Sequence, residues 1–241
     1  MAASCSPFVV AVSIRPGAAV TERKRHNQQV LLEFIRHHTV LAPVPFVPEI
    51  RLYQADEPIA LWEETERDGG SQPPPFWAFA WAGGQALARH VLDRPELVDG
   101  RAVLDLATGS GLVALAAARA GARPVTANDI DPFSLAAATA NAEANGLPVR
   151  TVEADLLDTD PEEQVILAGD VFYSQEMARR VLPFLRRAAF RGCLVLVGDP
   201  GRAYLPTGGM IKQAGYDVPV IESLEGVTVR HTTVWQVQAA G

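Results

Sequence analysis

Glycines and carboxylates that could hold a nucleotide cofactor gather around the segment "LDLATGSGLVA", which begins at Leu104. The segment has the pattern of a short strand, a glycine loop and an apolar helix. Gly109, Gly111 and Ala114 fit the spacing G-x-G-x-x-(G/A). Asp129 follows the loop after about twenty residues, which is also typical of a dinucleotide site. The pattern predicts a nucleotide-binding loop and leaves the identity of the nucleotide open.

Asp105, at the end of the expected strand before the loop, helps to choose between two cofactors. NAD carries two phosphates, so its site needs bare backbone N–H groups at a helix N-terminus and no nearby anion. S-adenosylmethionine carries a sulfonium, an ammonium and a carboxylate instead. Asp105 suits the ammonium, and the small residues from Gly109 to Gly111 let the backbone approach closely. We therefore expect S-adenosylmethionine.

Further carboxylates end the next two expected strands. Asp129 can bind both ribose hydroxyls, the neighbouring Ile130 can pack on adenine, and Asp155 is placed to meet the adenine amino group. Ala107 and Thr108 complete the loop part of the expected cofactor site. Carboxylates at successive strand ends are a more specific pattern than the glycine loop. The alternative is that these aspartates only cap helices or turns.

The acceptor side is expected after the fourth strand, where the chain reads Asp170-Val171-Phe172-Tyr173. Enzymes that methylate planar amide or base nitrogens commonly have prolines here, and this chain has none. An aspartate beside aromatic rings suits a flexible amine, and a lysine amine has an ordinary pKa of about 10.4. We expect Asp170 to orient and polarise the amine, with Phe172 or Tyr173 contacting it. For Phe172, packing in the core is the alternative.

The elements that must position these residues alternate along the chain. The short β-rich runs "AVLDL", "PVTAN", "VRTVE", "QVILAG" and "CLVLVG" are separated by helical segments, which predicts parallel strands. "VPVIESL" and "VTVRHTTVWQV" flank Glu225-Gly226 and predict an antiparallel hairpin. Asp131, Pro132 and Gly146 are expected to begin and end one helix. This is the α/β, Rossmann-like plan of class I S-adenosylmethionine-dependent methyltransferases: five parallel strands, a C-terminal antiparallel β-hairpin and a small N-terminal extension.

We expect three parts in the chain. Residues 1–28 resemble a disordered tail, residues 29–75 contain a helix at Val30–His38 and an arm, and residues 76–241 form the methyltransferase domain.

The composition limits which binding partners and which cellular compartment are expected. The net charge of −7 argues against a general affinity for nucleic acid or an anionic membrane, and no apolar run reaches the length of a membrane span. Cys5 and Cys193 lie in unrelated contexts, and no metal-ligand spacing occurs, so we expect a reducing compartment and no metal. The expected location is the bacterial cytoplasm. Because the first acidic residue is Glu22, the mitochondrial matrix is the alternative.

From about Val30 to Val237, the chain resembles the electron transfer flavoprotein β-subunit lysine methyltransferases of class I family 16. The resemblance is carried by "PEIRL", "FWAFAWAGGQALARHVLD", "VLDLATGSG", "ANDIDP", "GDVFY" and "GDPGR". The family's D-x-F-Y motif falls on Asp170, Phe172 and Tyr173. Its W-x-G-G segment implies that Trp81 lies beside the cofactor.

The resemblance implies S-adenosylmethionine-dependent methylation of lysines on the flavoprotein β-subunit, near its docking surface for dehydrogenases. Ala107 departs from the glycine of many relatives, and we recognise no counterpart for the residues before about Gln28. Rival functions are methylation of another protein, such as a ribosomal protein, or of a small amine. Rivals of a different class are a non-catalytic, chaperone-like binder of the cofactor and an NAD-dependent oxidoreductase. The partner is expected to be a protein substrate, and the oligomeric state is left open.

Overall fold

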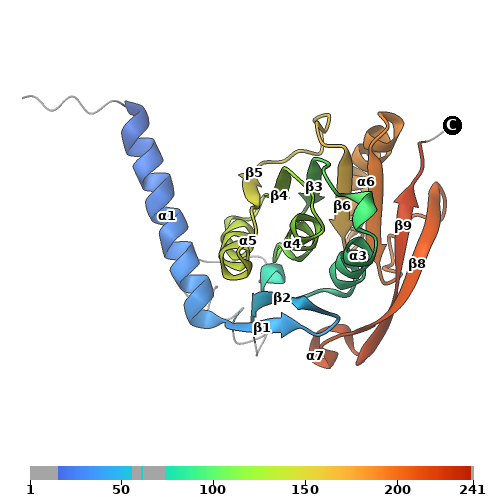
Figure 1. Cartoon of the computed structure of the whole chain (residues 1–241), viewed down its shortest axis with the longest axis horizontal. Coiled ribbons are helices and arrows are strands. Elements are labelled where there is room, and N and C mark those ends of the chain that lie inside the picture. Colours follow the sequence, from blue (N-terminus) through green and yellow to red (C-terminus); the bar gives the residue numbers. More distant parts are fainter. Residues whose placement is uncertain (1–15, 56–60, 62–73, 240–241) are drawn as a thin grey trace, which may run out of the picture.

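A seven-stranded sheet forms the centre of the computed structural model, which describes residues 16–55, 61 and 74–239 (Figure 1). The strand order is β5-β4-β3-β6-β7-β9-β8. The strands are β3 (Val103–Leu106), β4 (Val125–Asp129), β5 (Arg150–Glu153), β6 (Val165–Gly169), β7 (Leu194–Asp199), β8 (Met210–Pro219) and β9 (Val229–Val237). The strands β3 to β7 run parallel, whereas β9 is antiparallel to both β7 and β8. The predicted fold class is confirmed.

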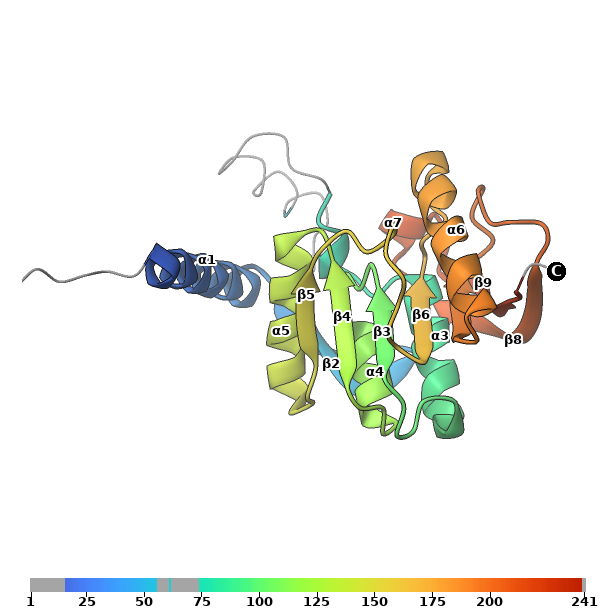
Figure 2. The same ribbon diagram turned by 90° about the horizontal axis from the view of Figure 1, so that it is seen from above.

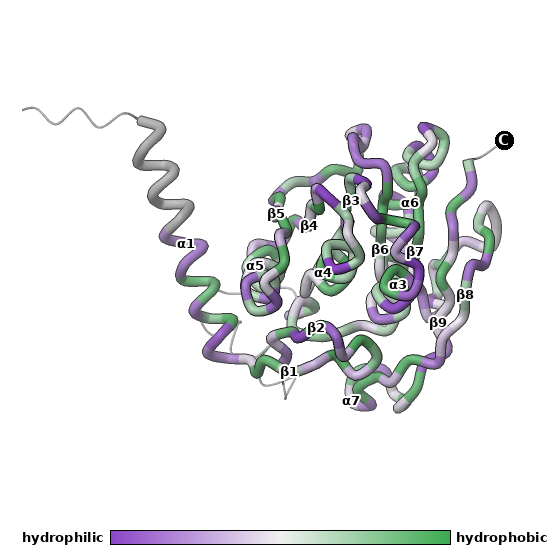
Figure 3. Tube along the Cα trace, viewed as in Figure 1, coloured by the Kyte–Doolittle hydropathy of each residue, from purple (hydrophilic) through white to green (hydrophobic). Residues whose placement is uncertain are grey.

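Helices cover both faces of the sheet (Figure 2). They are α3 (Ala82–Asp93), α4 (Leu112–Arg119), α5 (Pro132–Asn145) and α6 (Gln175–Phe190). Because successive side chains of a strand point to opposite faces, Val103 and Leu167 pack with α3, α4 and α5. Leu104 and Ile166 pack with α6 on the other face. Hydrophobic residues accordingly concentrate in the strands and helices around the sheet (Figure 3).

The capping signals expected for α5 are confirmed. The Asp131 carboxylate accepts hydrogen bonds from the N–H groups of Phe133 and Ser134, and Pro132 occupies the first helical position. Gly146 ends the helix in the left-handed region, with φ of +64°. The start of α5 is therefore fixed directly after β4, where the candidate site lies.

The N-terminal helix α1 spans Pro16–His38 and begins earlier than the expected Val30. The boundary at residue 28 between a tail and a helix is therefore not where the helix begins, and residues 1–15 lie outside the described residues. Proline suits a first turn, and alanine and charged helix formers follow it. Near its end, α1 buries Leu32 and Ile35 in a cluster with alanines of α5.

A small antiparallel sheet of β1 (Val40–Val44) and β2 (Val47–Gln54) follows α1. Ile50 and Leu52 are buried with Leu112 and Leu115 of α4, so this sheet covers the outer side of the helices. The expected arm thus begins as a strand, and most of its remainder lies outside the described residues. A short 3-10 helix, η1 (Phe76–Ala78), leads into α3, and η2 (Pro95–Leu97) follows it.

The C-terminal hairpin is present, but its first strand lies earlier than expected. "VPVIESL" was expected to be a strand, whereas β8 ends at Pro219 and Glu222–Glu225 forms the short helix α7. Gly226 ends α7 with φ of +70°. As an edge strand with mixed exposure, β8 lacks the hydrophobic alternation that would identify it from sequence. In the part of the chain that is described, no helix is long and apolar enough to cross a membrane.

Candidate functional site

The carboxyl ends of the five parallel strands lie at one edge of the sheet, where α/β folds bind their ligands. Asp105 lies in β3, Asp129 ends β4 and Asp170 directly follows β6, so the fold brings these carboxylates to that edge. Asp199, at the end of β7, adds one that the sequence analysis did not assign to the site.

Asp105 is buried beneath the glycine loop. One of its carboxylate oxygens, Oδ2, accepts hydrogen bonds from the Thr108 hydroxyl and from the Ala114 N–H, the latter at 3.0 Å. Burial raises the pKa of Asp105 to about 7, against the effect of these two hydrogen bonds. The contacts tie the loop to the first turn of α4. The expected contact of Asp105 with a cofactor ammonium stays a prediction, because the observed partners belong to the loop.

Three residues of the loop have left-handed backbone conformations, and the space beside one of these residues is open. Ala107, Gly109 and Gly111 have φ of +54°, +52° and +83°. A side chain at Gly111 would come within 2.9 Å of Ala138 in α5, so α5 closes that side of the loop. At Gly109 an added Cβ would meet nothing within 4 Å. The loop can therefore receive a ligand at Gly109, as the expected cofactor cradle requires.

Asp129 connects β4 to the same loop. Its Oδ2 accepts the Gly109 N–H at 3.1 Å, and its Oδ1 accepts the N–H groups of Ile130 and Asp131 at 2.8 and 3.0 Å. A carboxylate has about four acceptor positions, so one remains open on Oδ2. Burial raises the pKa of Asp129 despite these hydrogen bonds. The neighbouring Ile130 side chain is 69% exposed, which leaves an apolar surface beside the loop.

Asp155, past the end of β5, is held by α6. Its Oδ2 pairs with Arg180 at 2.7 Å, and its Oδ1 accepts the Leu157 N–H at 3.2 Å. The hydrogen bond from Arg180 lowers the pKa of Asp155. The expected contact with an adenine amino group stays a prediction, and any such contact has to share this carboxylate with Arg180.

Asp170 is fixed on three sides directly after β6. Its backbone has φ of +56°, and its N–H donates to the Gly198 carbonyl at 2.9 Å. Its Oδ2 accepts the Gly84 N–H at 2.9 Å, which places the carboxylate at the N-terminus of α3. Its Oδ1 accepts Nη2 and Nε of Arg202 at 2.7 and 3.1 Å. Burial raises the pKa of Asp170 to about 6, and Arg202 opposes this effect.

Glycines allow α3 to reach the ends of β6 and β7. A Cβ on Gly83 would lie 2.2 Å from the Gly198 carbonyl oxygen and 2.5 Å from Asp170 Oδ2. A Cβ on Gly169 would lie 2.9 Å from Gly84 Cα. Gly83, the first glycine of the W-x-G-G segment, therefore has a physical reason: only glycine at this position lets α3 approach Asp170 and Gly198 this closely.

Aromatic rings from the segment before α3 and from the segment after Asp170 form a cluster. Phe76 lies 5.9 Å from Trp81 and 5.8 Å from Tyr173, measured between ring centroids. The Trp81 indole N–H donates to the Phe76 carbonyl at 2.8 Å. Burial raises the pKa of the Tyr173 hydroxyl, and the charge of Asp129 adds to this. Phe76 was missed from sequence, although it begins the aromatic-rich segment "FWAFAW".

Phe172 does not border the site. Its side chain is 0% exposed and belongs to the core cluster that includes Val181 and Phe184 of α6. The predicted contact between Phe172 and a substrate amine is therefore wrong, because the ring faces the interior. The structure assigns the ring to packing, the alternative considered above.

An ion-pair network extends from Asp170 to the C-terminal hairpin. Arg202 Nη2 also contacts Glu225 Oε1 at 3.1 Å, and Arg230 contacts Glu225 Oε2 at 3.2 Å. The Arg202 guanidinium lies 5.7 Å from the centre of the Trp81 ring. Arg202 and Glu225 thus connect the aromatic rings, Asp170 and α7. They lie far apart in the sequence, so no local pattern signals this network.

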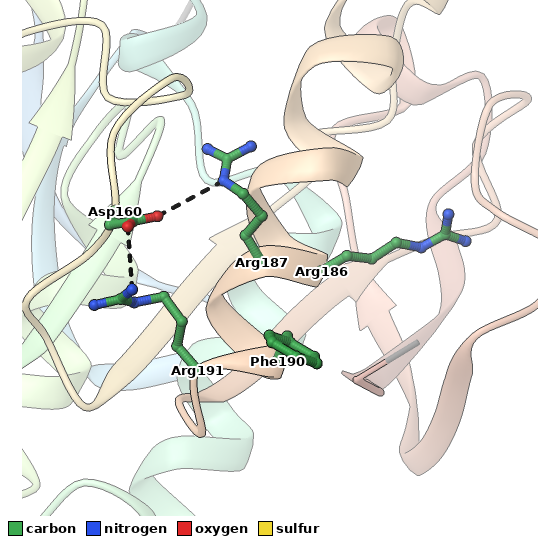
Figure 4. Close-up of a pocket in the computed structure, with 5 residues that line it drawn as sticks. All are labelled: Asp160, Arg186, Arg187, Phe190 and Arg191. Atoms are coloured by element: carbon green, nitrogen blue, oxygen red, sulfur yellow. Dashed lines mark hydrogen bonds and ion pairs between the residues drawn. The ribbon is translucent and has the colours of Figure 1, made fainter. Parts of the chain in front are cut away.

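A separate hollow of about 350 Å³ lies at the C-terminal end of α6 (Figure 4). It is lined by Asp160, Arg186, Arg187, Phe190 and Arg191. Asp160 pairs with Arg187 and Arg191. The helix α6 begins at the carboxyl ends of the parallel strands, where the candidate site lies, and ends before β7 starts. This hollow therefore lies at the opposite ends of the strands. Among the described residues, no group of His, Cys, Asp and Glu side chains could hold a metal ion.

Comparison with known proteins finds similar methyltransferases. Residues 86–174 match the model of the ribosomal protein L11 methyltransferase (PrmA) family. The electron transfer flavoprotein beta subunit lysine methyltransferase of Xenopus laevis is 35% identical over 234 residues, which cover 94% of each chain. A match of this extent reaches in front of Gln28, so the expectation that these residues have no counterpart is wrong. The Homo sapiens protein of the same name is 36% identical over 173 residues, covering 70% of this chain and 66% of that one.

Among solved structures, the 16S rRNA N2 G1207 methyltransferase of T. thermophilus, in complex with AdoMet and guanosine, has a similar fold. The TM-score is 0.52 at 19% sequence identity, and the match covers 83% of this chain and 50% of that chain. At this level of identity the likeness concerns the fold alone.

Proposed function

The chain belongs to the family of electron transfer flavoprotein beta subunit lysine methyltransferases, and on this basis we propose that it methylates lysine side chains of that flavoprotein subunit. The methyl donor is S-adenosylmethionine. When bound, this cofactor supplies a methyl group on a positively charged sulfur. The rest of the work falls to the residues at the carboxyl edge of the sheet.

The loop after β3 fits the cofactor. The open space at Gly109 admits a ligand against the backbone, and the free acceptor position of Asp129 suits one ribose hydroxyl. Because the other positions of that carboxylate hold backbone N–H groups, we assign it one hydroxyl rather than both. Exposed Ile130 suits the face of adenine. Asp105, with Ala107 and Thr108, shapes the loop, and Trp81 and Asp155 complete the proposed cofactor set.

Asp170 is the proposed contact for the lysine amine. A lysine ammonium is attracted to a carboxylate and to aromatic faces, and Arg202 joins Asp170 to the cluster of Trp81, Phe76 and Tyr173. Only the neutral amine has the lone pair that attacks the methyl carbon, and its ordinary pKa is about 10.4. Asp170 accepts an N–H of the amine and aligns it, while the proton leaves to water. Alignment is the main requirement of this transfer.

The observation that carries the proposal is the position of Asp170. Its carboxylate is fixed at the N-terminus of α3, at the same strand edge as the Gly109 loop, and its partner Arg202 faces the Trp81 ring of the aromatic cluster. An amine held there is adjacent to a cofactor in the loop.

The three-part division of the chain at residues 28 and 75 is likewise proposed, with α1 extending into the first part.

Methylation of the purified flavoprotein beta subunit tests the proposal. We expect the subunit to gain methyl groups on lysine when incubated with this protein and S-adenosylmethionine, as read by mass spectrometry of its peptides. The Asp170→Ala variant is the matched control. A beta subunit that stays unmodified under conditions where the cofactor binds would contradict the proposed substrate.

A ribosomal protein is the second candidate substrate, favoured by the match of residues 86–174 to the ribosomal protein L11 methyltransferase model. That segment includes the glycine loop and reaches only to the start of α6. Labelling a whole extract with a radioactive methyl donor, followed by identification of the labelled proteins, distinguishes the two substrates.

A further inference from the structure

We propose that Arg202 is a positioning residue of the methyl-transfer reaction, which fixes the Asp170 carboxylate so that one acceptor position of Oδ2 faces the substrate amine. This inference rests on the proposed function and names a residue that the family motif D-x-F-Y does not contain. It follows from the geometry of the contacts around Asp170.

Arg202 occupies one whole side of the Asp170 carboxylate. Its Nη2 and Nε both donate to Oδ1, at 2.7 and 3.1 Å, so both acceptor positions of that oxygen are used. The Gly84 N–H takes one position of Oδ2, at 2.9 Å. One position of Oδ2 is left. An amine N–H can therefore reach Asp170 from one direction only, next to the N-terminus of α3.

Arg202 is itself held from several directions. Its backbone N–H donates to Asp199 Oδ1 at 2.7 Å, in a turn where the same oxygen also accepts the Gly201 N–H. Its guanidinium contacts Glu225 Oε1 at 3.1 Å and faces the Trp81 ring. The Glu225 side chain is 5% exposed and is paired with Arg230. A guanidinium held this way is a fixed part of the site, unlike a mobile surface arginine.

The charges of the network add a second reason for Arg202. Arg202 pairs with Asp170 and Glu225, and Arg230 also pairs with Glu225, whereas Asp199 accepts the backbone N–H of Arg202. The second oxygen of Asp199, Oδ2, is buried and has no hydrogen-bond partner. Without Arg202, Asp170 would face an unpaired buried carboxylate with only the Gly84 N–H to stabilise its own charge. Arg202 therefore also keeps Asp170 ionised.

Kinetics of Arg202→Ala and Arg202→Lys test the proposal, with Arg186→Lys as the matched control. Arg186 lines the hollow at the far end of α6 and forms no ion pair with the described part of the chain. We expect kcat to fall by about 10- to 100-fold in Arg202→Ala, because the misplaced carboxylate no longer aligns the amine. S-adenosylmethionine affinity, measured by calorimetry, should stay near the wild-type value in all three variants.

Two further readouts separate positioning from a loss of folding. Added guanidinium, well below denaturing concentrations, should restore part of the rate of Arg202→Ala, whereas sodium chloride at equal ionic strength should not. The acid limb of the pH–rate profile should move to higher pH in Arg202→Lys, because a single ammonium pairs less well with Asp170. The charged groups that face Asp170 are Arg202 and Asp199, with Glu225 and Arg230 behind them, and these groups influence the pH–rate profile.

Wild-type kcat and an unmoved pH profile in Arg202→Lys overturn the proposal. Should Arg202→Ala not fold, Arg202→Lys decides the question alone, since it keeps the charge and the length of the side chain. An Asp170→Ala variant with wild-type turnover would show instead that the proposed function places the amine wrongly, so the two failures are distinguishable.

Discussion

At the scale of single residues, the site depends on carboxylates that the fold buries and then supplies with hydrogen bonds. Asp105, Asp129, Asp170 and Asp199 all have raised pKa values because of burial. Each accepts backbone N–H groups that oppose this effect. Keeping these carboxylates ionised at the carboxyl ends of the strands therefore destabilises the fold. Shifted pKa values of this kind are common at functional sites.

The Asp105→Asn variant should reveal this effect through pH. The pKa of Asp105 is about 7 in the folded protein and 3.8 ordinarily, so the folded protein binds the proton more tightly. The wild type should therefore lose free energy of unfolding relative to the variant as the pH rises from about 4 to about 7, by up to about 4 kcal/mol. Denaturant titrations of both proteins across this range measure the difference. A difference that is independent of pH would contradict the burial argument.

Sequence patterns identify some of these residues and miss others for a physical reason. Asp129 and Gly109 could be predicted because a strand end and a glycine loop are local patterns. The contacts of Asp170 with Gly84 and Arg202 join segments 86 and 32 residues apart, which no local pattern encodes. The D-x-F-Y spacing also does not say which ring faces inward, so the burial of Phe172 required the structure.

At the scale of elements, the contact of α3 with β6 and β7 places Asp170. The parallel strands and the capped α5 could be predicted from sequence because their hydrophobic runs and capping residues are local. The edge strand β8 could not, since one face is exposed and its residues are mixed. The early start of α1 was missed because its polar first half has no hydrophobic periodicity to mark it.

Alanine substitutions of the adjacent glycines in α3 test that contact. Gly83→Ala places a Cβ 2.2 Å from the Gly198 carbonyl oxygen, so we expect a loss of about 1–3 kcal/mol in the free energy of unfolding. Methyl transfer should also fall, because Asp170 must move. Gly84→Ala is the matched control: its Cβ would meet only Val113, at 3.9 Å, and should leave stability unchanged or raise it by up to about 1 kcal/mol. Equal effects of the two substitutions in thermal unfolding would contradict the assigned contact.

At the scale of the whole molecule, the C-terminal end of α1 packs against α5 and the β1–β2 sheet packs against α4, while the rest of α1 extends away from the domain (Figure 1). Leu32 and Ile35 are buried where α1 meets α5, and Arg36 pairs with Glu143 there. Among the α1 residues whose side chains are described, those that anchor the helix thus lie after residue 28, in line with the proposed division of the chain.

Two truncations test this division. Removing residues 1–28 should leave the free energy of unfolding and cofactor affinity unchanged, because Leu32 and Ile35 remain in the core cluster. Removing residues 1–38 should cost about 3 kcal/mol or more, since Leu32 and Ile35 leave the core cluster. Chemical denaturation measures both. A large loss on removing only the first 28 residues would refute the proposed boundary.

The central claim is that Asp170 holds a lysine amine beside a methyl donor in the Gly109 loop. Turnover of the flavoprotein beta subunit by Asp170→Ala, measured together with S-adenosylmethionine binding on the same preparation, tests it most directly. We expect cofactor affinity to be retained and turnover to fall by about 100-fold or more. An Asp170→Ala variant that binds the cofactor and methylates the subunit at the wild-type rate would contradict the account.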